Sequence, residues 1–106
     1  WSRISCDISE AMLARHPGER LVCCDVRRLP FRDASVAVVA GLNAVPHFGE
    51  FSRVIQPGGH LLWATSFGPR TPMYVSPEDL ERQLPGWTAT ARLAGAGEWT
   101  LLERNR

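Results

Sequence analysis

The chain has 106 residues, of which 44% are hydrophobic and 22% charged, and its formal net charge is +1. This length and composition predict one small globular domain over residues 1–106 and exclude a disordered chain. A net charge near zero gives no electrostatic reason to expect nucleic acid or a membrane surface as a partner, and no apolar run reaches the roughly 20 residues of a membrane span.

The cysteines and histidines are not spaced like metal ligands. The three cysteines lie inside apolar runs without a CxxC spacing: Cys6, Cys23 and Cys24. This usage is typical of reduced thiols in a cytoplasmic protein. The three histidines lie far apart in the sequence: His16, His47 and His60. We therefore expect no metal site.

The first part of the chain alternates strands with a helix. Short apolar runs predict three strands, over residues 3–6, 21–24 and 36–40. Residues 9–16 favour a helix, which Pro17 and Gly18 end. Residues 29–35 are rich in turn-forming residues and predict a loop.

The second part begins with helix and strand and ends in a hairpin. Apolar spacing predicts a helix over residues 48–55, which the turn at residues 57–59 ends, and then a strand over residues 60–65. Ser76 and Pro77 open a helix that runs through Leu84. Residues 87–93 alternate apolar and polar side chains, and residues 98–103 return as the antiparallel partner. The order of elements predicts an α/β fold whose parallel sheet ends in an antiparallel hairpin.

Two aspartates follow neighbouring predicted strands. Asp7 follows the first strand and Asp25 follows the second. The carboxyl ends of parallel strands face the same crevice, where α/β sheets bind ligands. One carboxylate there can accept hydrogen bonds from both hydroxyls of a ribose, and the next can accept one from the amino group of an adenine. Adenosine is the simplest ligand that satisfies both.

Four stretches, in order and spacing, resemble one family: "CDISEAML", "CCDVRRLPF", "ASVAVVAGLNAVPHF" and "EFSRVIQPGGHLLWATS". The chain is similar to the class I S-adenosylmethionine-dependent methyltransferases, a Rossmann-like fold, and most of all to the small-molecule branch around ubiquinone and menaquinone biosynthesis. The likeness covers residues 4–66. It implies a transferase that binds S-adenosyl-L-methionine and methylates a small-molecule acceptor.

The resemblance also implies roles for particular residues. Asp7 would hold the ribose hydroxyls and Asp25 the adenine amino group. Ile8 and Met12 would flank the nucleoside, and the backbone N–H of Val26 would meet the adenine ring. The methionine end would be lined by the residues after the third strand: Gly41, Leu42 and Asn43. Leu29, Pro30 and Phe31 would form a structural turn, with Phe31 in the core.

The sequence departs from the family pattern in two places. The family's first strand, glycine-rich loop and following helix would stand before Trp1, so the chain resembles the later part of the domain. Because that strand lies centrally, we expect the sheet to divide into two pieces and the methionine carboxylate to lose backbone donors. The stretch 43–53 is short, so we expect a stunted helix.

Each candidate residue has a structural alternative. Asp7 could cap the following helix, with Glu10 completing a capping box, and Asp25 could merely form a turn. His47 is a candidate general base for an acceptor hydroxyl, or a loop histidine with local hydrogen bonds. Three apolar residues could line an acceptor pocket or simply pack: Phe67, Met73 and Tyr74. We expect Trp63 and Trp99 in the core.

The sequence is also compatible with two other functions. A nicotinamide-dinucleotide Rossmann domain also carries an acid after its second strand, although the terminal hairpin argues against it. A truncated or degenerate domain could instead act as a non-catalytic scaffold, as a homo-oligomer or beside a complementing chain.

Overall fold

The computed structural model describes residues 4–7, 20–23, 26–70, 72–95 and 97–106, and for residues 4–7, 20–23 and 94 it describes the backbone alone. The chain divides into two compact units, residues 1–30 and 31–106. The helix predicted over residues 9–16 lies outside the described residues.

The described strands of the first unit form a two-stranded parallel sheet. β1 (Ile4–Asp7) pairs with β2 (Arg20–Cys23), and the register sets Ile4 beside Arg20 and Asp7 beside Cys23. Both strands predicted here are confirmed to within one residue. Because the strands are parallel, their carboxyl ends lie at the same edge of this small sheet.

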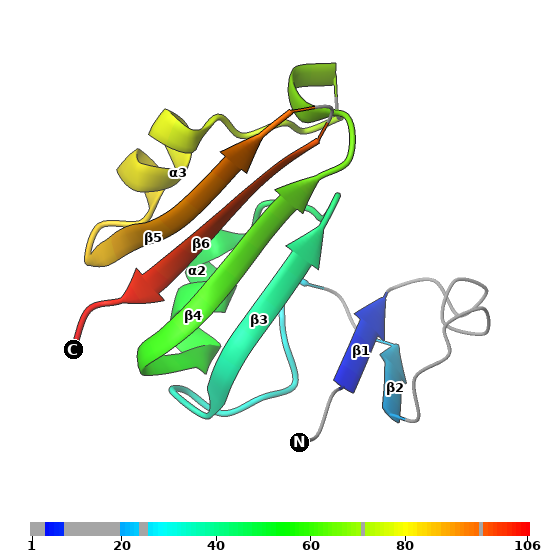
Figure 1. Cartoon of the computed structure of the whole chain (residues 1–106). Helices are drawn as coiled ribbons and strands as arrows, with labels where there is room; N and C mark the ends of the chain where they lie inside the picture. The colour runs from blue at the N-terminus through cyan, green and yellow to red at the C-terminus, as the bar shows by residue number, and fades with distance from the viewer. Residues whose placement is uncertain (1–3, 8–19, 24–25, 71, 96) are drawn as a thin grey trace. The chain divides into compact units, whose positions relative to one another are not determined.

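The second unit contains a four-stranded mixed sheet in the order β3-β4-β6-β5 (Figure 1). β3 (Val36–Leu42) and β4 (Ile55–Thr65) are parallel. β5 (Trp87–Ala94) and β6 (Glu98–Arg104) form an antiparallel hairpin, of which β6 pairs with β4. The parallel strands with a terminal hairpin are therefore confirmed. So is the division into two sheets, since no described strand of β1–β2 pairs with one of β3–β6.

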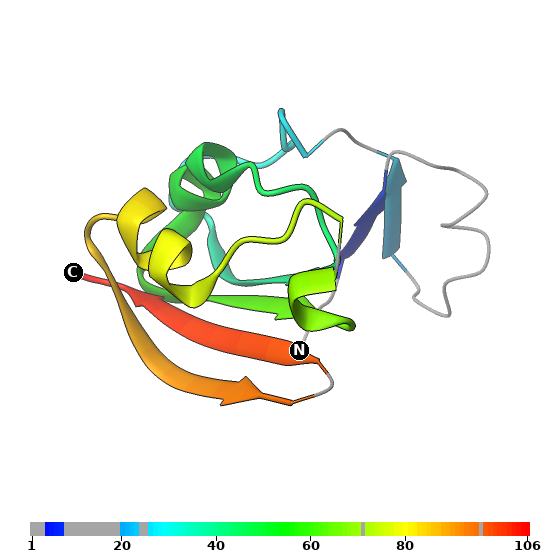
Figure 2. The same ribbon diagram turned by 90° about the horizontal axis from the view of Figure 1, so that it is seen from above.

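Both described helices of the second unit, α2 (Phe48–Val54) and α3 (Pro77–Gln83), lie over one face of this sheet (Figure 2). Ser76 caps α3 by accepting a hydrogen bond from the Asp79 N–H at 3.2 Å, and Pro77 takes the first turn, where no N–H is needed. A 3₁₀ turn, η1 (Gly68–Arg70), follows β4. With seven residues, α2 is as short as predicted.

The core lies between the helices and the covered face of the sheet. Its buried side chains come from both helices, from the residues that flank α3, and from β4 and β6: Phe48, Phe51, Val54, Ile55, Leu61, Trp63, Val75, Leu80, Leu84 and Leu102. Trp63 stands edge-on to Phe48, with ring centroids 5.0 Å apart. The rings of Phe51 and Trp63 are tilted, with centroids 5.9 Å apart. This aromatic cluster fixes α2 on the sheet.

Arg53 joins α2 to the loop before β3. Its guanidinium binds both oxygens of Glu50, at 2.7 and 2.9 Å, and donates to the Phe31 carbonyl and the Asp33 carboxylate. The hydrogen bonds to Glu50 and then to Asp33 raise the pKa of Arg53. The loop predicted over residues 29–35 is confirmed, and Arg53 is the residue that holds its end.

Four details of the sequence prediction are wrong. β4 begins directly after α2, so residues 57–59 are its irregular start and not a separate turn. Gly58 adopts a φ of +79° there. β3 continues through Gly41 and Leu42, because both still pair with β4. Phe31 is half-buried, and Trp99 is half-buried on the face opposite Trp63.

No described helix covers the second face of the four-stranded sheet (Figure 2). The strand register nevertheless gives this face many apolar residues. The register places Leu42, Ala64, Trp99 and Leu93 in one row across this face, and Ala40, Leu62, Leu101 and Ala91 in the next. A third row is more polar: Val38, His60, Glu103 and Thr88. Leu42 and Leu93 are 67% and 57% exposed. We call this surface the open face.

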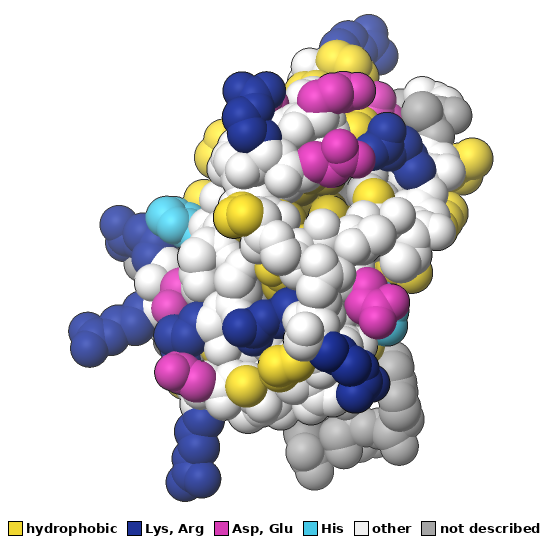
Figure 3. Space-filling model, turned by 90° about the vertical axis from the view of Figure 1, so that its left-hand side faces the viewer, with side chains coloured by type: hydrophobic (Ala, Val, Ile, Leu, Met, Phe, Trp, Pro, Cys, Tyr) yellow, Lys and Arg dark blue, Asp and Glu magenta, His cyan; other side chains and the backbone are white. Residues whose placement is uncertain are grey.

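Charges on the side that bears β5 and α3 are mixed, with arginines and acidic residues interspersed (Figure 3). Arg92 on β5 pairs with Glu81 on α3 at 3.1 Å, and Arg82 pairs with Asp79 at 2.6 Å. Such exposed pairs add little stability. Within the described part of the chain, no helix is long and apolar enough to cross a membrane.

Candidate functional site

The carboxyl ends of β3 and β4 meet at one edge of the four-stranded sheet, and a reciprocal pair of hydrogen bonds joins them. The Asn43 side chain accepts from the Ser66 N–H at 2.9 Å and donates to the Ser66 hydroxyl at 3.0 Å. The Asn43 backbone N–H donates to the Ala64 carbonyl at 2.9 Å. These bonds hold the first residue after β3 against the end of β4.

Asn43 adopts a left-handed conformation, with φ of +51°. Asparagine tolerates this region better than most residues because its short polar side chain can bond locally. One N–H and one lone pair of its amide remain after the bonds to Ser66, and the residue is exposed. The predicted contact of Asn43 with the methionine end of a cofactor stays a prediction, and the bonds to Ser66 explain its position without one.

Gly41 has a structural reason to lack a side chain. A Cβ atom there would come within 2.6 Å of the Trp63 ring, which Phe48 and Phe51 already hold. Real Cβ atoms do not approach so closely, so the glycine makes room for Trp63. Leu42, by contrast, is exposed at the end of an edge strand and is free to contact a ligand.

Two further exposed apolar residues follow the parallel strands. Phe67, directly after Ser66, is 62% exposed, and Met73 is 56% exposed with φ of +59°. A left-handed backbone conformation costs energy in a methionine, and residues with such strained conformations are enriched at functional sites. These two residues are therefore open to solvent at the positions predicted to line an acceptor pocket.

Tyr74 lies on the same loop but is half-buried and bonded. Its hydroxyl donates to the Glu98 carboxylate on β6 at 2.7 Å. Burial, and after it the hydrogen bond to Glu98, raises the pKa of the Tyr74 hydroxyl to about 12. Sequence reasoning missed Glu98, because a partner 24 residues away leaves no local signal.

His47 provides the N-cap position of α2. Its carbonyl accepts hydrogen bonds from the Glu50 and Phe51 N–H groups, at 3.2 and 3.4 Å, and its side chain makes no capping bond. It stands four residues beyond Asn43 and is half-buried. A general-base role for His47 stays a prediction. The described residues contain no group of His, Cys, Asp or Glu side chains that could hold a metal ion.

The remaining predicted cofactor contacts fall in the first unit. Ile8, Met12 and Asp25 lie outside the described residues. Asp7 is the last residue of β1, at the carboxyl edge of its sheet, and Val26 is half-buried. Because β2 ends at Cys23 beside Asp7, Asp25 follows it by two residues along the chain. The backbone thus places the carboxyl ends of both strands at one edge, as a ribose and adenine site requires.

In each of the two units taken by itself, the described strand ends offer features that an adenosyl cofactor requires. Leu42 offers exposed apolar surface and Asn43 keeps polar capacity at the end of β3. Asp7 ends β1 at the edge where a ribose would be read. Gly41 gives no support for a cofactor contact, because the close approach of the Trp63 ring already explains why this position is a glycine.

Parallel strand pairs, one of them finished by an antiparallel hairpin, define a Rossmann-like α/β fold. The family model described as "Methyltransferase domain" matches residues 2–63, more than half of the chain. The chain belongs to this methyltransferase domain family. None of the curated proteins matches it in sequence.

Solved structures share the fold at low sequence identity. The PH0226 protein from Pyrococcus horikoshii OT3 matches with a TM-score of 0.76 at 15% identity, over 99% of this chain and 72% of its own. A Sulfolobus solfataricus protein assigned to the type 11 methyltransferases matches at 0.71 and 13% identity, over 95% and 69%. The [4+2]-cyclase SpnF matches at 0.71 and 14%, over 96% and 66%. The chain therefore spans about seven tenths of these proteins.

Proposed function

We propose that the protein transfers a methyl group from S-adenosylmethionine to a small-molecule acceptor. The observation that carries this proposal is the family match, because residues 2–63 include the ends of all three strands that the cofactor would meet. The fold shared with a type 11 methyltransferase supports it. A cytoplasmic location, suggested by the cysteine usage of the sequence, is part of the same proposal.

The proposed binding residues are those at the carboxyl edges. Asp7 and Asp25 would accept hydrogen bonds from the ribose hydroxyls and the adenine amino group, with Ile8, Met12 and Val26 around the nucleoside. Leu42 and Asn43 would face the methionine end. The position of Asp7 at the end of β1 supports its role, since charge-assisted bonds to a diol need a carboxylate at that edge.

The chemistry asks little of the side chains. The bound cofactor supplies a methyl group that its sulfonium already activates. The protein then has to align the acceptor with that methyl group and exclude water. Phe67 and Met73, both exposed at this edge, are suited to contact an apolar part of the acceptor. His47, at the start of α2, is the candidate to take a proton from an acceptor hydroxyl.

Two other candidates stay beside this one. A dinucleotide-binding domain is disfavoured by the antiparallel β5–β6 hairpin. A non-catalytic scaffold, alone or with a complementing chain, is supported by the division of the described strands into two sheets. The cyclase SpnF shares the fold, and fold alone does not determine the reaction.

A competition experiment separates these candidates. Radiolabelled S-adenosylmethionine is equilibrated with the chain across a dialysis membrane, and unlabelled S-adenosylhomocysteine or NAD is then added. We expect S-adenosylhomocysteine to displace the label and NAD to leave it in place. Displacement by NAD would favour a dinucleotide domain, whereas no retention of the label would favour the scaffold.

A further inference from the structure

Four side chains form a block of neighbouring positions on the helix-covered face of the sheet. Trp63 on β4 lies opposite Thr100 on β6, and Thr65 lies opposite Glu98. Residues two apart on a strand share a face, and residues opposite each other in an antiparallel pair are close neighbours. These four therefore surround one small area of the sheet surface.

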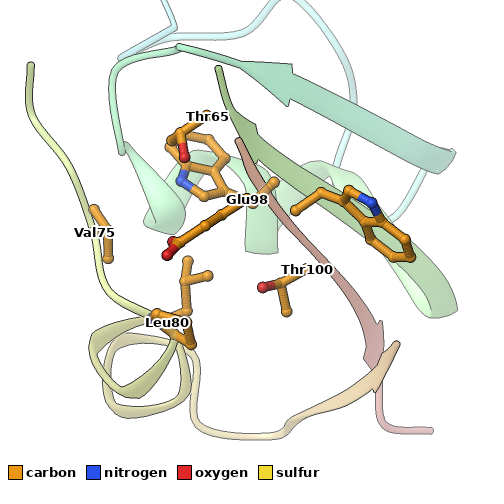
Figure 4. Close-up of a pocket in the computed structure, with 8 residues that line it drawn as sticks. Thr65, Val75, Leu80, Glu98 and Thr100 are labelled. Atoms are coloured by element: carbon orange, nitrogen blue, oxygen red, sulfur yellow. The ribbon is translucent and has the colours of Figure 1, made fainter. Parts of the chain in front are cut away.

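A small cavity lies over this block (Figure 4). Val75, from the loop before α3, and Pro77 and Leu80, from α3, line its other side. In Figure 4 the hydroxyls of Thr65 and Thr100 point toward the space between the two strands and α3. The cavity leaves about 10 Å³ for the centre of a water-sized sphere. That is close to the minimum for one water molecule and too small for an organic ligand.

Two buried polar atoms at this cavity lack a hydrogen-bond partner among the described residues. They are the indole Nε1 of Trp63 and the hydroxyl oxygen of Thr65. Trp63 is 3% exposed and Thr65 is 6% exposed, so bulk water does not reach them. Buried polar groups are almost always bonded, because leaving one unsatisfied forfeits its hydration without compensation.

The chemistry of these groups selects the occupant. An indole N–H can only donate, so the occupant must accept a hydrogen bond. This excludes ammonium and metal cations. The Glu98 carboxylate, bonded to Tyr74 at 2.7 Å, lines the same cavity and disfavours an anion. The hydroxyls of Thr65 and Thr100 can each donate or accept, which suits a water molecule.

The distances along the sheet also suit one bridging water. Thr65 and Thr100 are diagonal neighbours across β4 and β6, and such positions lie roughly 7–8 Å apart. When both side chains point toward each other, the distance between their hydroxyl oxygens is shorter. Two hydrogen bonds of about 2.8 Å, made through one water molecule, can span that distance.

We propose that a single buried water molecule accepts a hydrogen bond from the Trp63 indole and bridges it to the hydroxyls of Thr65 and Thr100. Thr65 directly precedes Ser66, which holds Asn43 at the end of β3. The water therefore fixes the last residues of β4, next to the contact between Ser66 and Asn43. This site is independent of whether the protein transfers methyl groups.

Nuclear magnetic resonance of the isotope-labelled chain tests the proposal. We expect a cross-relaxation peak between water and the Trp63 indole proton, with the sign of a water that stays bound longer than the molecule tumbles. Trp63→Phe identifies the peak by removing it. In Thr65→Val, which keeps the side-chain shape but loses the hydroxyl, the peak should weaken at least several-fold.

Thr88→Val is the matched control, because the Thr88 hydroxyl bonds Asn105 at 2.8 Å on the open face. This variant should leave the Trp63 peak unchanged. The absence of a water peak at Trp63 in the folded unmodified chain would overturn the proposal. So would a peak of equal strength in Thr65→Val, or a crystal structure in which the indole donates directly to a protein oxygen.

Discussion

The two faces of the four-stranded sheet are formed by alternate residues of the same strands. They are similar in polarity, but described helices cover only one of them. On β4, Leu61 and Trp63 face the helices, whereas Leu62 and Ala64 lie on the open face. A sheet with one face in solvent normally alternates apolar and polar residues. Here two of the three rows on the open face are apolar throughout. The strands have the composition of a sheet that is buried on both faces. Described helices, however, cover only one of the two faces.

The largest expected effect comes from neighbouring leucines on opposite faces. Leu61→Ala should lower the free energy of unfolding by about 2–5 kcal/mol, because Leu61 is fully buried beneath the helices. Leu62→Ala should cost under about 1.5 kcal/mol, since a half-buried side chain gains only part of its transfer free energy. Urea denaturation of both variants measures the difference. Equal losses would mean that the open face is as well packed as the covered one.

The next prediction compares the effects on stability of replacing two glycines by alanine. Gly41→Ala should destabilise the protein by about 1–3 kcal/mol, because the added methyl would meet the Trp63 ring at 2.6 Å. Gly49→Ala, in α2 with no atom within 4 Å of the new Cβ, should stabilise it by about 0.5–1 kcal/mol. Thermal melting of the two variants should therefore shift in opposite directions. A neutral Gly41→Ala would show that Trp63 can move aside.

The contact between Asn43 and Ser66 predicts a smaller, unequal pair of effects. Asn43→Ala loses both side-chain bonds and puts alanine at a φ of +51°, so it should cost about 1–2 kcal/mol. Ser66→Ala keeps the Ser66 N–H bonded to Asn43 and should cost about 0.5 kcal/mol. Chemical denaturation measures both, and equal costs would contradict the bracing role of Asn43.

The last expected effect is confined to alkaline solution and is a pH dependence from Tyr74. Its pKa in the folded protein is raised from 10.0 to about 12, so the folded state holds the proton more tightly than the unfolded chain. The stability from this group is complete below pH 10 and is lost as pH rises from 10 toward 12. Because the chain has a single tyrosine, tyrosinate absorption reports the titration directly. A midpoint near 10, or the same alkaline loss of stability in Tyr74→Phe, would refute the contribution.

Local patterns in the sequence predicted most of the fold. Apolar runs and period-two alternation located the six described strands, and Ser76 with Pro77 located the start of α3. The errors arose where tertiary contacts overrode local preference. Pairing with β4 draws Gly41 and Leu42 into β3, and Gly58 enters β4 although Pro-Gly-Gly is a turn pattern. Trp99 was placed in the core because nothing in the local sequence says which face of a hairpin is covered.

The candidate site was less predictable than the fold. Motif resemblance pointed to the ends of the strands, where Asp7, Leu42 and Asn43 lie. It could not show that Asn43 is bonded to Ser66, or that Tyr74 is bonded to Glu98, because these pairs are 23 and 24 residues apart. The same holds for the cavity at Trp63 and Thr65, which depends on the register of β4 with β6.

Calorimetric titration of the chain with S-adenosylhomocysteine tests the central proposal most directly. We expect saturable binding in the micromolar range, weakened by about 1.5–3 kcal/mol in Asp25→Ala and in Asp7→Ala, since each would lose a charge-assisted bond. Asp33→Ala is the control, because Asp33 is exposed and pairs with Arg53 at 2.9 Å. Its affinity should be unchanged. No heat of binding from the folded chain, or equal affinity in all variants, would contradict a cofactor site at these carboxylates.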